Sequence, residues 1–169
     1  MIILNTNLNK YKNRGLELER ILINTFNQRK YKEIALIEKS PTPIQVLKNE
    51  DDFISKAFFK RVSTLDFVGV FKTKHIEIEA KTTQNPNIFN FNNIQKHQSD
   101  RIKSLVELGA LVYLIIEFKP INRFFLLNGE QTLQFYESSP KNIDINTIKE
   151  NSIELFLKPN FTLDVLENI

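Results

Sequence analysis

Hydrophobic and polar residues alternate most clearly between positions 62 and 81. Phe67 to Phe71 is a short hydrophobic run that predicts one strand, and Lys72-Thr73-Lys74 is a polar turn. His75 to Lys81 then alternates strictly and predicts a second strand. Because successive side chains of a strand point to opposite faces, one face carries Ile76, Ile78 and Ala80, and the other Glu77, Glu79 and Lys81. The pattern predicts a β-hairpin with Asp66 at its mouth.

Helical spacing of hydrophobic residues appears on both sides of this hairpin. After Asn13-Arg14-Gly15, hydrophobic positions recur at helical intervals through Phe26. Residues 94–108 predict a second helix that Gly109 ends. Its inner side is expected to consist of Ile94, Gln98, Arg101, Ile102, Leu105 and Leu108. Residues 82–93 read as a polar connection in which Phe89 and Phe91 pin a loop.

Further strands are predicted at Glu33 to Lys39, Ala110 to Glu117 and Arg123 to Leu127. Residues 44–61, after Pro41-Thr42-Pro43, predict a long antiparallel excursion that projects from the sheet. Residues 130–169 indicate an edge element and one or two helices. The order of elements predicts an α/β fold with a mixed central sheet flanked by helices.

Length and composition limit the chemistry, the cellular location and the partners that we expect for this protein. The 169 residues suit a single domain, 1–169, and the absence of cysteine excludes disulfides and thiolate chemistry. No stretch is long enough to span a membrane and no signal peptide is recognisable, so we expect a cytoplasmic protein with no membrane partner. Residues 1–100 hold 16 Lys and Arg against 11 Asp and Glu, which weakly indicates a polyanionic partner.

The hairpin also supplies candidate chemistry. It can bring Asp66, Glu79 and Lys81 to one edge, where two carboxylates and a lysine suit a hard cation such as Mg²⁺ and a charged phosphate. The alternative is that Glu79 and Lys81 belong to the solvated face of a half-buried strand. The hairpin alone leaves these two interpretations level.

Five motifs occur in a fixed order: Asn13-Arg14-Gly15 with Leu18-Glu19; Lys39 with Pro41-Thr42-Pro43-Ile44-Gln45; Ser63-Thr64-Leu65-Asp66; Glu79-Ala80-Lys81-Thr82; and His97-Gln98. In this series, from about Asn13 to Glu117, the chain resembles the RecU family of Holliday junction resolvases in the PD-(D/E)XK nuclease superfamily. The resemblance implies a restriction-endonuclease-like fold and a Mg²⁺-dependent endonuclease that resolves four-way DNA junctions in recombination and repair.

The resemblance also implies roles for individual residues. Thr64, Asp66, Glu79 and Gln98 fall on the family's magnesium-binding positions, and Mn²⁺ is expected to substitute. Lys81 falls on the lysine that stabilises the transition state, which makes Asp66, Glu79 and Lys81 the catalytic set. Residues 44–61 resemble the stalk that enters the junction. A homodimer on four-way junction DNA is implied, with a recombinase as a further candidate partner.

The expected DNA-binding residues are Arg14, Lys56, Phe58, Lys60 and Arg61, and the candidate accessory residues are Glu19 and His97. One departure from the family concerns the stalk tip, where Glu50, Asp51 and Asp52 stand in place of basic residues. Negative charge there opposes entry between phosphates. Two alternatives therefore stay open: a junction-binding or recombinase-modulating protein with weak cleavage, and a related nuclease that acts on other branched or duplex DNA.

Overall fold

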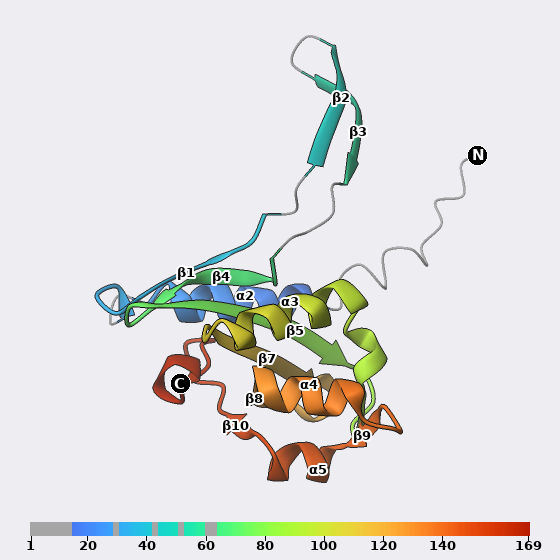
Figure 1. The fold of residues 1–169 in the computed structure, drawn as a ribbon. Helices are drawn as coiled ribbons and strands as arrows, with labels where there is room; N and C mark the ends of the chain where they lie inside the picture. Colours follow the sequence, from blue (N-terminus) through green and yellow to red (C-terminus); the bar gives the residue numbers. More distant parts are fainter. Residues whose placement is uncertain (1–14, 29–30, 42–43, 51–52, 60–63) are drawn as a thin grey trace, which may run out of the picture.

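The computed structural model describes residues 15–169 except 29–30, 42–43, 51–52 and 60–63, and between 42 and 63 it describes backbone alone. Its centre is a six-stranded mixed sheet (Figure 1). The strands lie in the order β1 (Ala35–Lys39), β4 (Phe67–Phe71), β5 (Lys74–Thr83), β7 (Leu111–Phe118), β8 (Arg123–Asn128) and β10 (Ile153–Leu155). β5 and β7 pair in parallel and their other neighbours are antiparallel. The predicted α/β class is confirmed.

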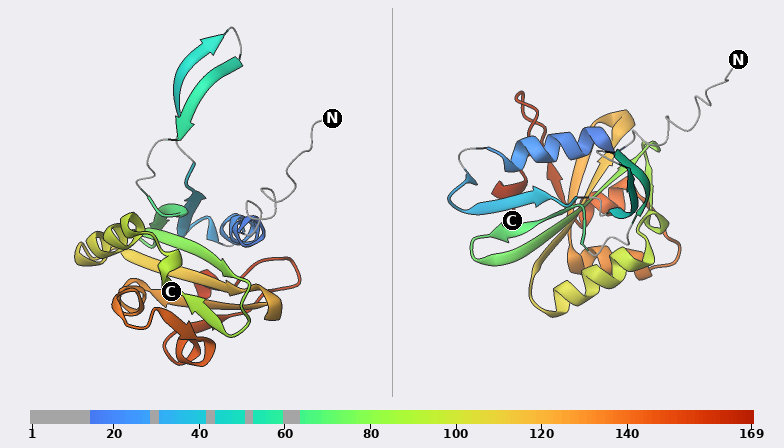
Figure 2. Two further views of the ribbon diagram at one scale, coloured as in Figure 1. Left: turned by 90° about the vertical axis from the view of Figure 1, so that its right-hand side faces the viewer. Right: turned by 90° about the horizontal axis from the view of Figure 1, so that it is seen from above.

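Helices cover both faces of the sheet, as the view from above shows (Figure 2). The helices of the described residues are α2 (Leu16–Phe26), α3 (Lys96–Glu107), α4 (Gly129–Glu137) and α5 (Ile145–Glu150). Short 3₁₀ turns lie at Phe91–Asn93, Lys119–Ile121 and Val165–Glu167. Leu18 and Leu22 of α2 pack in one core with Ile76 and Ile78 of β5. On the other face, α3 packs against the sheet through a core that includes Ile102 and Val112.

The predicted hairpin is present with a tighter turn than expected. Lys72 and Thr73 alone form the turn, both with positive φ (47° and 77°), and Phe71 pairs with Lys74. Positive φ at both central residues matches the right-handed twist of the flanking strands. β4 also runs very close to β1, since a Cβ on Gly69 would lie 1.9 Å from the Leu36 carbonyl oxygen. The hairpin is therefore a fixed part of the sheet.

The excursion between β1 and β4 is a two-stranded antiparallel ribbon of β2 (Ile44–Glu50) and β3 (Phe53–Phe59). Figure 1 shows it projecting away from the six-stranded sheet. The extended pairing agrees with the expected projection. Residues 51–52, which include most of the acidic tip, lie outside the described residues.

Two expectations are wrong in detail. The segment 82–93 is not only a connection: β5 continues to Thr83, and β6 (Ile88–Asn90) pairs with β9 (Asn142–Asp144). Phe89 and Phe91 in it are fully buried, as expected for residues that pin a loop. Leu108 does not join the inner side of its helix, because α3 ends at Glu107 and Leu108 is 83% exposed.

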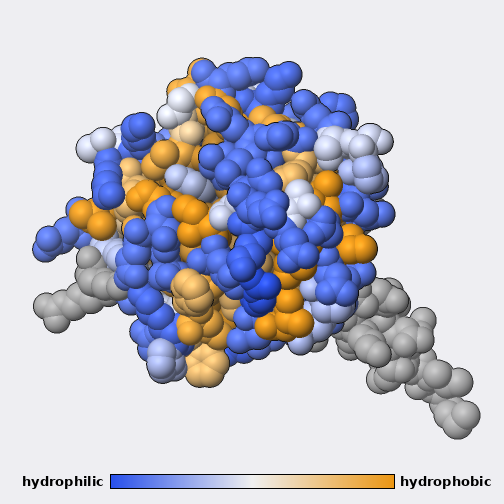
Figure 3. Space-filling model, turned by 90° about the horizontal axis from the view of Figure 1, so that it is seen from below, coloured by the Kyte–Doolittle hydropathy of each residue, from blue (hydrophilic) through white to orange (hydrophobic). Residues whose placement is uncertain are grey.

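The surface seen from below carries small hydrophobic groups separated by hydrophilic side chains (Figure 3). Among the described residues, no helix is long and apolar enough to cross a membrane.

Candidate active site

Asp66 lies directly before β4 and is held against the neighbouring strand β5. Its Oδ2 accepts a hydrogen bond from the backbone N–H of Ala80 at 2.9 Å. Ala80 stands between Glu79 and Lys81 in the sequence, so this bond joins the loop that carries Asp66 to the strand that carries the other two. The hairpin thereby brings together the three residues predicted to be catalytic.

Glu79 is buried, and its two carboxylate oxygens differ in their surroundings. Oε1 lies 2.7 Å from Nζ of Lys81 and accepts a hydrogen bond from Nε2 of Gln98 at 2.6 Å. Oε2 is buried and has no hydrogen-bond partner among the described residues. An unpartnered buried carboxylate oxygen is costly, which makes Oε2 the atom that needs explanation.

The environment of Glu79 disfavours its charged form. Burial raises the pKa of Glu79 to about 7, and the negative charge of Asp66 acts in the same direction. The positive charge of Lys81 opposes both but does not cancel them. The negative charges of Asp66 and Glu79 therefore repel each other, and Lys81 offsets this repulsion only in part. A cation bound between the two carboxylates would remove it.

Gln98 sits in the first turn of α3 and makes two hydrogen bonds. Its Oε1 accepts from the backbone N–H of Gln95 at 2.9 Å, which is half of a capping box, while its Nε2 donates to Glu79. Because the Gln95 N–H needs an acceptor, the cap fixes the orientation of the amide. In this arrangement Gln98 presents its nitrogen to Glu79, and its oxygen accepts from the Gln95 N–H and keeps capacity for one further contact.

Thr64 is half-buried beside the loop of Asp66, and its Oγ1 donates to Oγ of Ser40 at 3.0 Å. The backbone N–H of Ser40 in turn donates to the Asp66 carbonyl at 2.8 Å. The end of β1 therefore supports the loop from Thr64 to Asp66. The hydroxyl of Thr64 keeps acceptor capacity for a further contact.

Of the accessory and DNA-binding candidates, the structure describes the side chains of Glu19 and His97. Glu19, in α2, pairs with Lys39 at the end of β1, and His97 is half-buried next to Gln98. Lys56 and Phe58 lie in β3, whose side chains are not described. Arg14, Lys60 and Arg61 lie outside the described residues.

A buried carboxylate, Glu77, and its partly exposed partner Arg101 were not assigned a role from the sequence. Glu77 is fully buried, and Arg101 of α3 pairs with it. The alternation of β5 assigned Glu77 and Glu79 to one face, and this is the face that α3 covers. The alternative interpretation, a solvated face that carries Glu79 and Lys81, is therefore wrong for Glu79, whose side chain is buried. The signal available in the sequence was Arg101 on the expected inner side of its helix.

The donor set suits a hard divalent cation. Among the described residues, no group of three His, Cys, Asp or Glu side chains could hold a metal ion alone. Asp66 and Glu79 supply two carboxylates, and neutral oxygens or water would complete a shell for Mg²⁺, which retains several waters in protein sites. The unpartnered Oε2 of Glu79 is the observation that fits a cation.

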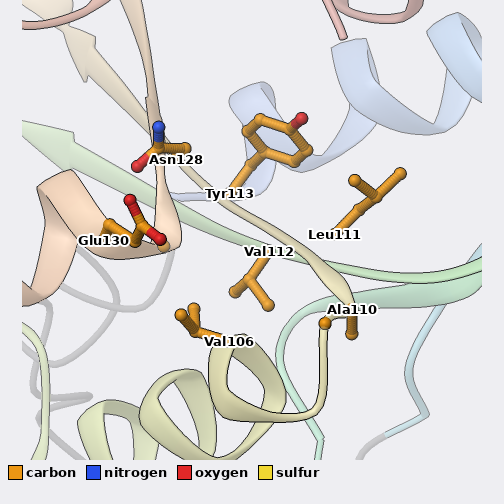
Figure 4. Close-up of a pocket in the computed structure, with 9 residues that line it drawn as sticks. Val106, Ala110, Leu111, Val112, Tyr113, Asn128 and Glu130 are labelled. Atoms are coloured by element: carbon orange, nitrogen blue, oxygen red, sulfur yellow. The ribbon is translucent and has the colours of Figure 1, made fainter.

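A separate hollow is lined by residues that include Val106, Ala110, Tyr113, Asn128 and Glu130 (Figure 4). It opens at the start of β7 and the end of β8. None of the residues predicted for the active site lines it, so it is distinct from the centre formed by Asp66 and Glu79.

Comparison with known proteins shows the family of the chain. The family model "Recombination protein U", RecU, matches residues 13–169. The chain belongs to the RecU family. The match includes every residue proposed for the site and extends over β8, β10 and α5, well beyond the motifs recognised from the sequence. The mixed sheet with helices on both faces agrees with the α/β fold and flanked central sheet predicted from the sequence.

RecU relatives match most of the chain. The Holliday junction resolvase RecU of Geobacillus sp. (strain WCH70) is 34% identical over 132 residues, 75% of this chain and 66% of that protein. The chain thus spans just under two thirds of the length of this relative. The protein of the same name from Pediococcus pentosaceus is 30% identical over 168 residues, 94% of this chain and 84% of that protein.

Among solved structures, Archaeoglobus fulgidus Hjc, a Holliday junction resolvase, aligns with 73% of this chain and 87% of its own. The TM-score is 0.42 and the sequence identity is 13%.

Proposed function

We propose that this protein is a Mg²⁺-dependent endonuclease that resolves four-way DNA junctions. The observation that carries the proposal is the unequal environment of the two Glu79 oxygens. Lys81 and Gln98 bind Oε1, whereas Oε2 is buried without a hydrogen-bond partner among the described residues in a site that also contains Asp66. RecU relatives named Holliday junction resolvases supply the substrate class. Mn²⁺ would serve in place of Mg²⁺.

Each residue has a defined task in this proposal. Asp66 and Glu79 would hold the cation, and Thr64 and Gln98 are the proposed neutral members of the site, directly or through water. When bound, Mg²⁺ would activate a water and neutralise charge on the scissile phosphate.

Lys81 is the proposed donor to that phosphate. Its Nζ lies 2.7 Å from Oε1 of Glu79 and its side chain is 20% exposed, so the ammonium is anchored and still open to solvent. A lysine can donate three hydrogen bonds, so the contact with Glu79 leaves donors for a phosphate oxygen that gains charge in the transition state. In the conformation described above, Gln98 would act by orienting Glu79. Glu19 and His97 are kept as accessory candidates.

Junction recognition is assigned to the stalk, residues 44–61, with β2 and β3 as its projecting ribbon. Arg14, Lys56, Lys60 and Arg61 would contact phosphates, and Phe58 would stack on a base. A homodimer is part of the proposal, because two identical sites related by a two-fold axis match the symmetry-related strands of a four-way junction. The proposed location is the cytoplasm.

The test is cleavage of a labelled four-way junction with Mg²⁺, with Mn²⁺, and with chelator. We expect cleavage with either metal, none in chelator, and junction binding in all three. Deleting residues 46–58 should remove the preference for junction over duplex in competition binding and leave metal-dependent nicking intact. Cleavage in chelator would refute the metal site, and a deletion variant that keeps full junction preference would refute the assigned role of the stalk.

A second candidate is a junction-binding or recombinase-modulating protein with weak cleavage. It is favoured by Glu50, Asp51 and Asp52 at the stalk tip, since negative charge there opposes entry between phosphates. Changing all three to Asn should tighten junction binding more than duplex binding, and the gain should shrink as salt rises. Strong cleavage by the unaltered protein would exclude this candidate; cleavage of duplex DNA at the same rate would favour a nuclease of broader substrate range.

A further inference from the structure

Glu77 is a fully buried carboxylate whose oxygens bind three separate parts of the chain. Its Oε2 accepts from the backbone N–H of Leu65 at 3.0 Å and from Nε of Arg101 at 3.2 Å. Its Oε1 is paired with Nη2 of Arg101 and lies 3.0 Å from Nε2 of His75. A buried charge with this many donors is satisfied, and its contacts are fixed in direction.

The segments joined by Glu77 are those that carry the proposed site. Leu65 lies between Thr64 and Asp66 in the loop before β4. Arg101 follows Gln98 by three residues on α3, which places both on one side of the helix. Glu77 itself precedes Glu79 by two residues on β5 and shares its face.

Two parallel cross-links therefore connect β5 and α3. Gln98 donates to Glu79 within the proposed site, and Arg101 donates to Glu77 beside it. The Leu65 N–H adds the loop of Asp66 to the second cross-link, while the Ala80 N–H holds Asp66 itself. If Glu77 and Arg101 were replaced, the bond from the Ala80 N–H to Asp66 would be the one bond of this set that still holds the loop of Asp66 to β5.

We infer that Glu77 and Arg101 are positioning residues that set the distance and orientation of Asp66 relative to Glu79, and thereby the affinity of the site for its divalent cation. This inference rests on the proposed function of Asp66 and Glu79 as metal ligands. Neither Glu77 nor Arg101 contacts the cation or the DNA in this account. They act by holding the loop at Leu65 and the helix at Gln98 in register with β5.

The most direct variant is Arg101→Lys, which keeps the positive charge and loses the two-pronged contact of the guanidinium. Loss of a residue that orients metal ligands lowers metal affinity by roughly 10- to 100-fold. We expect the Mg²⁺ dissociation constant of the DNA-free protein, measured by calorimetry, to rise by about tenfold or more. The Mg²⁺ needed for half-maximal junction cleavage should rise equally, and cleavage at saturating Mg²⁺ should recover to within about threefold of the unaltered protein.

The chain offers a matched control in the pair of Arg123 and Glu154. Arg123 of β8 binds Glu154 of β10 with Nε–Oε1 and Nη2–Oε2 distances of 2.6 and 2.8 Å. It is also a two-pronged arginine–glutamate contact, and neither residue belongs to the proposed site. Arg123→Lys should leave the Mg²⁺ dissociation constant unchanged.

A second measurement makes the inference independent of metal. Hydrogen exchange of the metal-free protein should become faster for the segment around Leu65 in Arg101→Lys and in Glu77→Gln, and should stay unchanged there in Arg123→Lys. This readout separates the inference from the proposed function. A protein that fails to cleave junctions but shows this exchange pattern keeps the positioning role and loses the nuclease assignment.

Two results would overturn the inference. If Arg101→Lys lowers the melting temperature but leaves both Mg²⁺ affinity and exchange at Leu65 as in Arg123→Lys, the pair only stabilises the fold. If Glu77→Gln binds Mg²⁺ normally and stays inactive at saturating Mg²⁺, Glu77 takes part in the chemistry directly. If Glu77→Gln does not fold, the Mg²⁺ affinity and the hydrogen exchange at Leu65 in Arg101→Lys decide whether the inference holds.

Discussion

Glu77 and Glu79 lie two residues apart on the same strand, face the same helix and are both fully buried. Their carboxylates nevertheless have opposite properties. Burial alone would raise the pKa of Glu77, but hydrogen bonds from Arg101, Leu65 and His75 outweigh it and leave that pKa below its ordinary value. The pKa of Glu79 is instead raised to about 7 by burial and by the charge of Asp66.

The difference teaches that burial by itself does not distinguish a structural carboxylate from a functional one. The two carboxylates differ in whether each of their oxygens has a hydrogen-bond donor. Both oxygens of Glu77 are partnered by the guanidinium of Arg101, whereas one oxygen of Glu79 has no partner among the described residues. A satisfied carboxylate holds its neighbours in place, and an unsatisfied one marks the position where a ligand is needed.

The largest expected difference between the two glutamates is in cleavage. Glu79→Gln and Asp66→Asn should each reduce junction cleavage at saturating Mg²⁺ by roughly 10²–10³-fold or more, the scale for losing a group that stabilises developing charge. Glu77→Gln should retain most of the saturating rate. Single-turnover cleavage of a labelled four-way junction over a range of Mg²⁺ concentrations measures both. Equal losses for Glu77→Gln and Glu79→Gln at saturating metal would erase the distinction drawn here.

The sequence predicted much of this arrangement because the relevant signals are local. Strict alternation from His75 to Lys81 gave the strand, and the hydrophobic run from Phe67 gave its partner with Asp66 at the mouth. Family motifs then pointed to Thr64, Asp66, Glu79, Lys81 and Gln98. The hydrogen bonds of Asp66 to Ala80 and of Gln98 to Glu79 agree with that grouping.

The burial of the polar face was not predictable in the same way. Alternation fixes which side chains share a face but not what covers that face, and α3 follows β5 only after a connection that contains its own strand. The pairing of Glu77 with Arg101 joins residues 24 positions apart and needs the packing of that helix. The prediction that Leu108 lies on the inner side of the helix was wrong for a related reason. The helical spacing of hydrophobic residues continues past Glu107, at which α3 ends.

The second expected difference is in the pH dependence of stability, measured with chelator present. The pKa of Glu79 is raised in the folded protein from 4.5 to about 7, so its stabilising contribution is complete below 4.5 and is lost as pH rises through 7. This shift corresponds to ~3 kcal/mol of unfolding free energy. Glu79→Gln should therefore match or exceed the unaltered protein in stability at pH 8.

Glu77 should show the opposite slope. Its pKa is lowered in the folded protein, so its stabilising contribution is present above the ordinary value of 4.5 and disappears as pH falls through the folded value. Glu77→Gln should cost about 2 kcal/mol at pH 7, because Arg101 loses its partner, and progressively less in acid. Urea unfolding of both variants between pH 4 and pH 8 measures the slopes. Parallel curves for the two variants would contradict the assigned environments.

The smallest expected effect concerns His75, the third partner of Glu77. Its Nε2 lies 3.0 Å from Oε1 of Glu77, but the side chain is 42% exposed, so water can replace the contact. Glu77 would still be held by Arg101 and by the Leu65 N–H. His75→Thr, which keeps a residue that favours strands, should cost less than ~1 kcal/mol in urea unfolding and leave the Mg²⁺ dissociation constant unchanged. A cost as large as that of Glu77→Gln would mean that His75, rather than Arg101, supplies the decisive compensation for the buried charge.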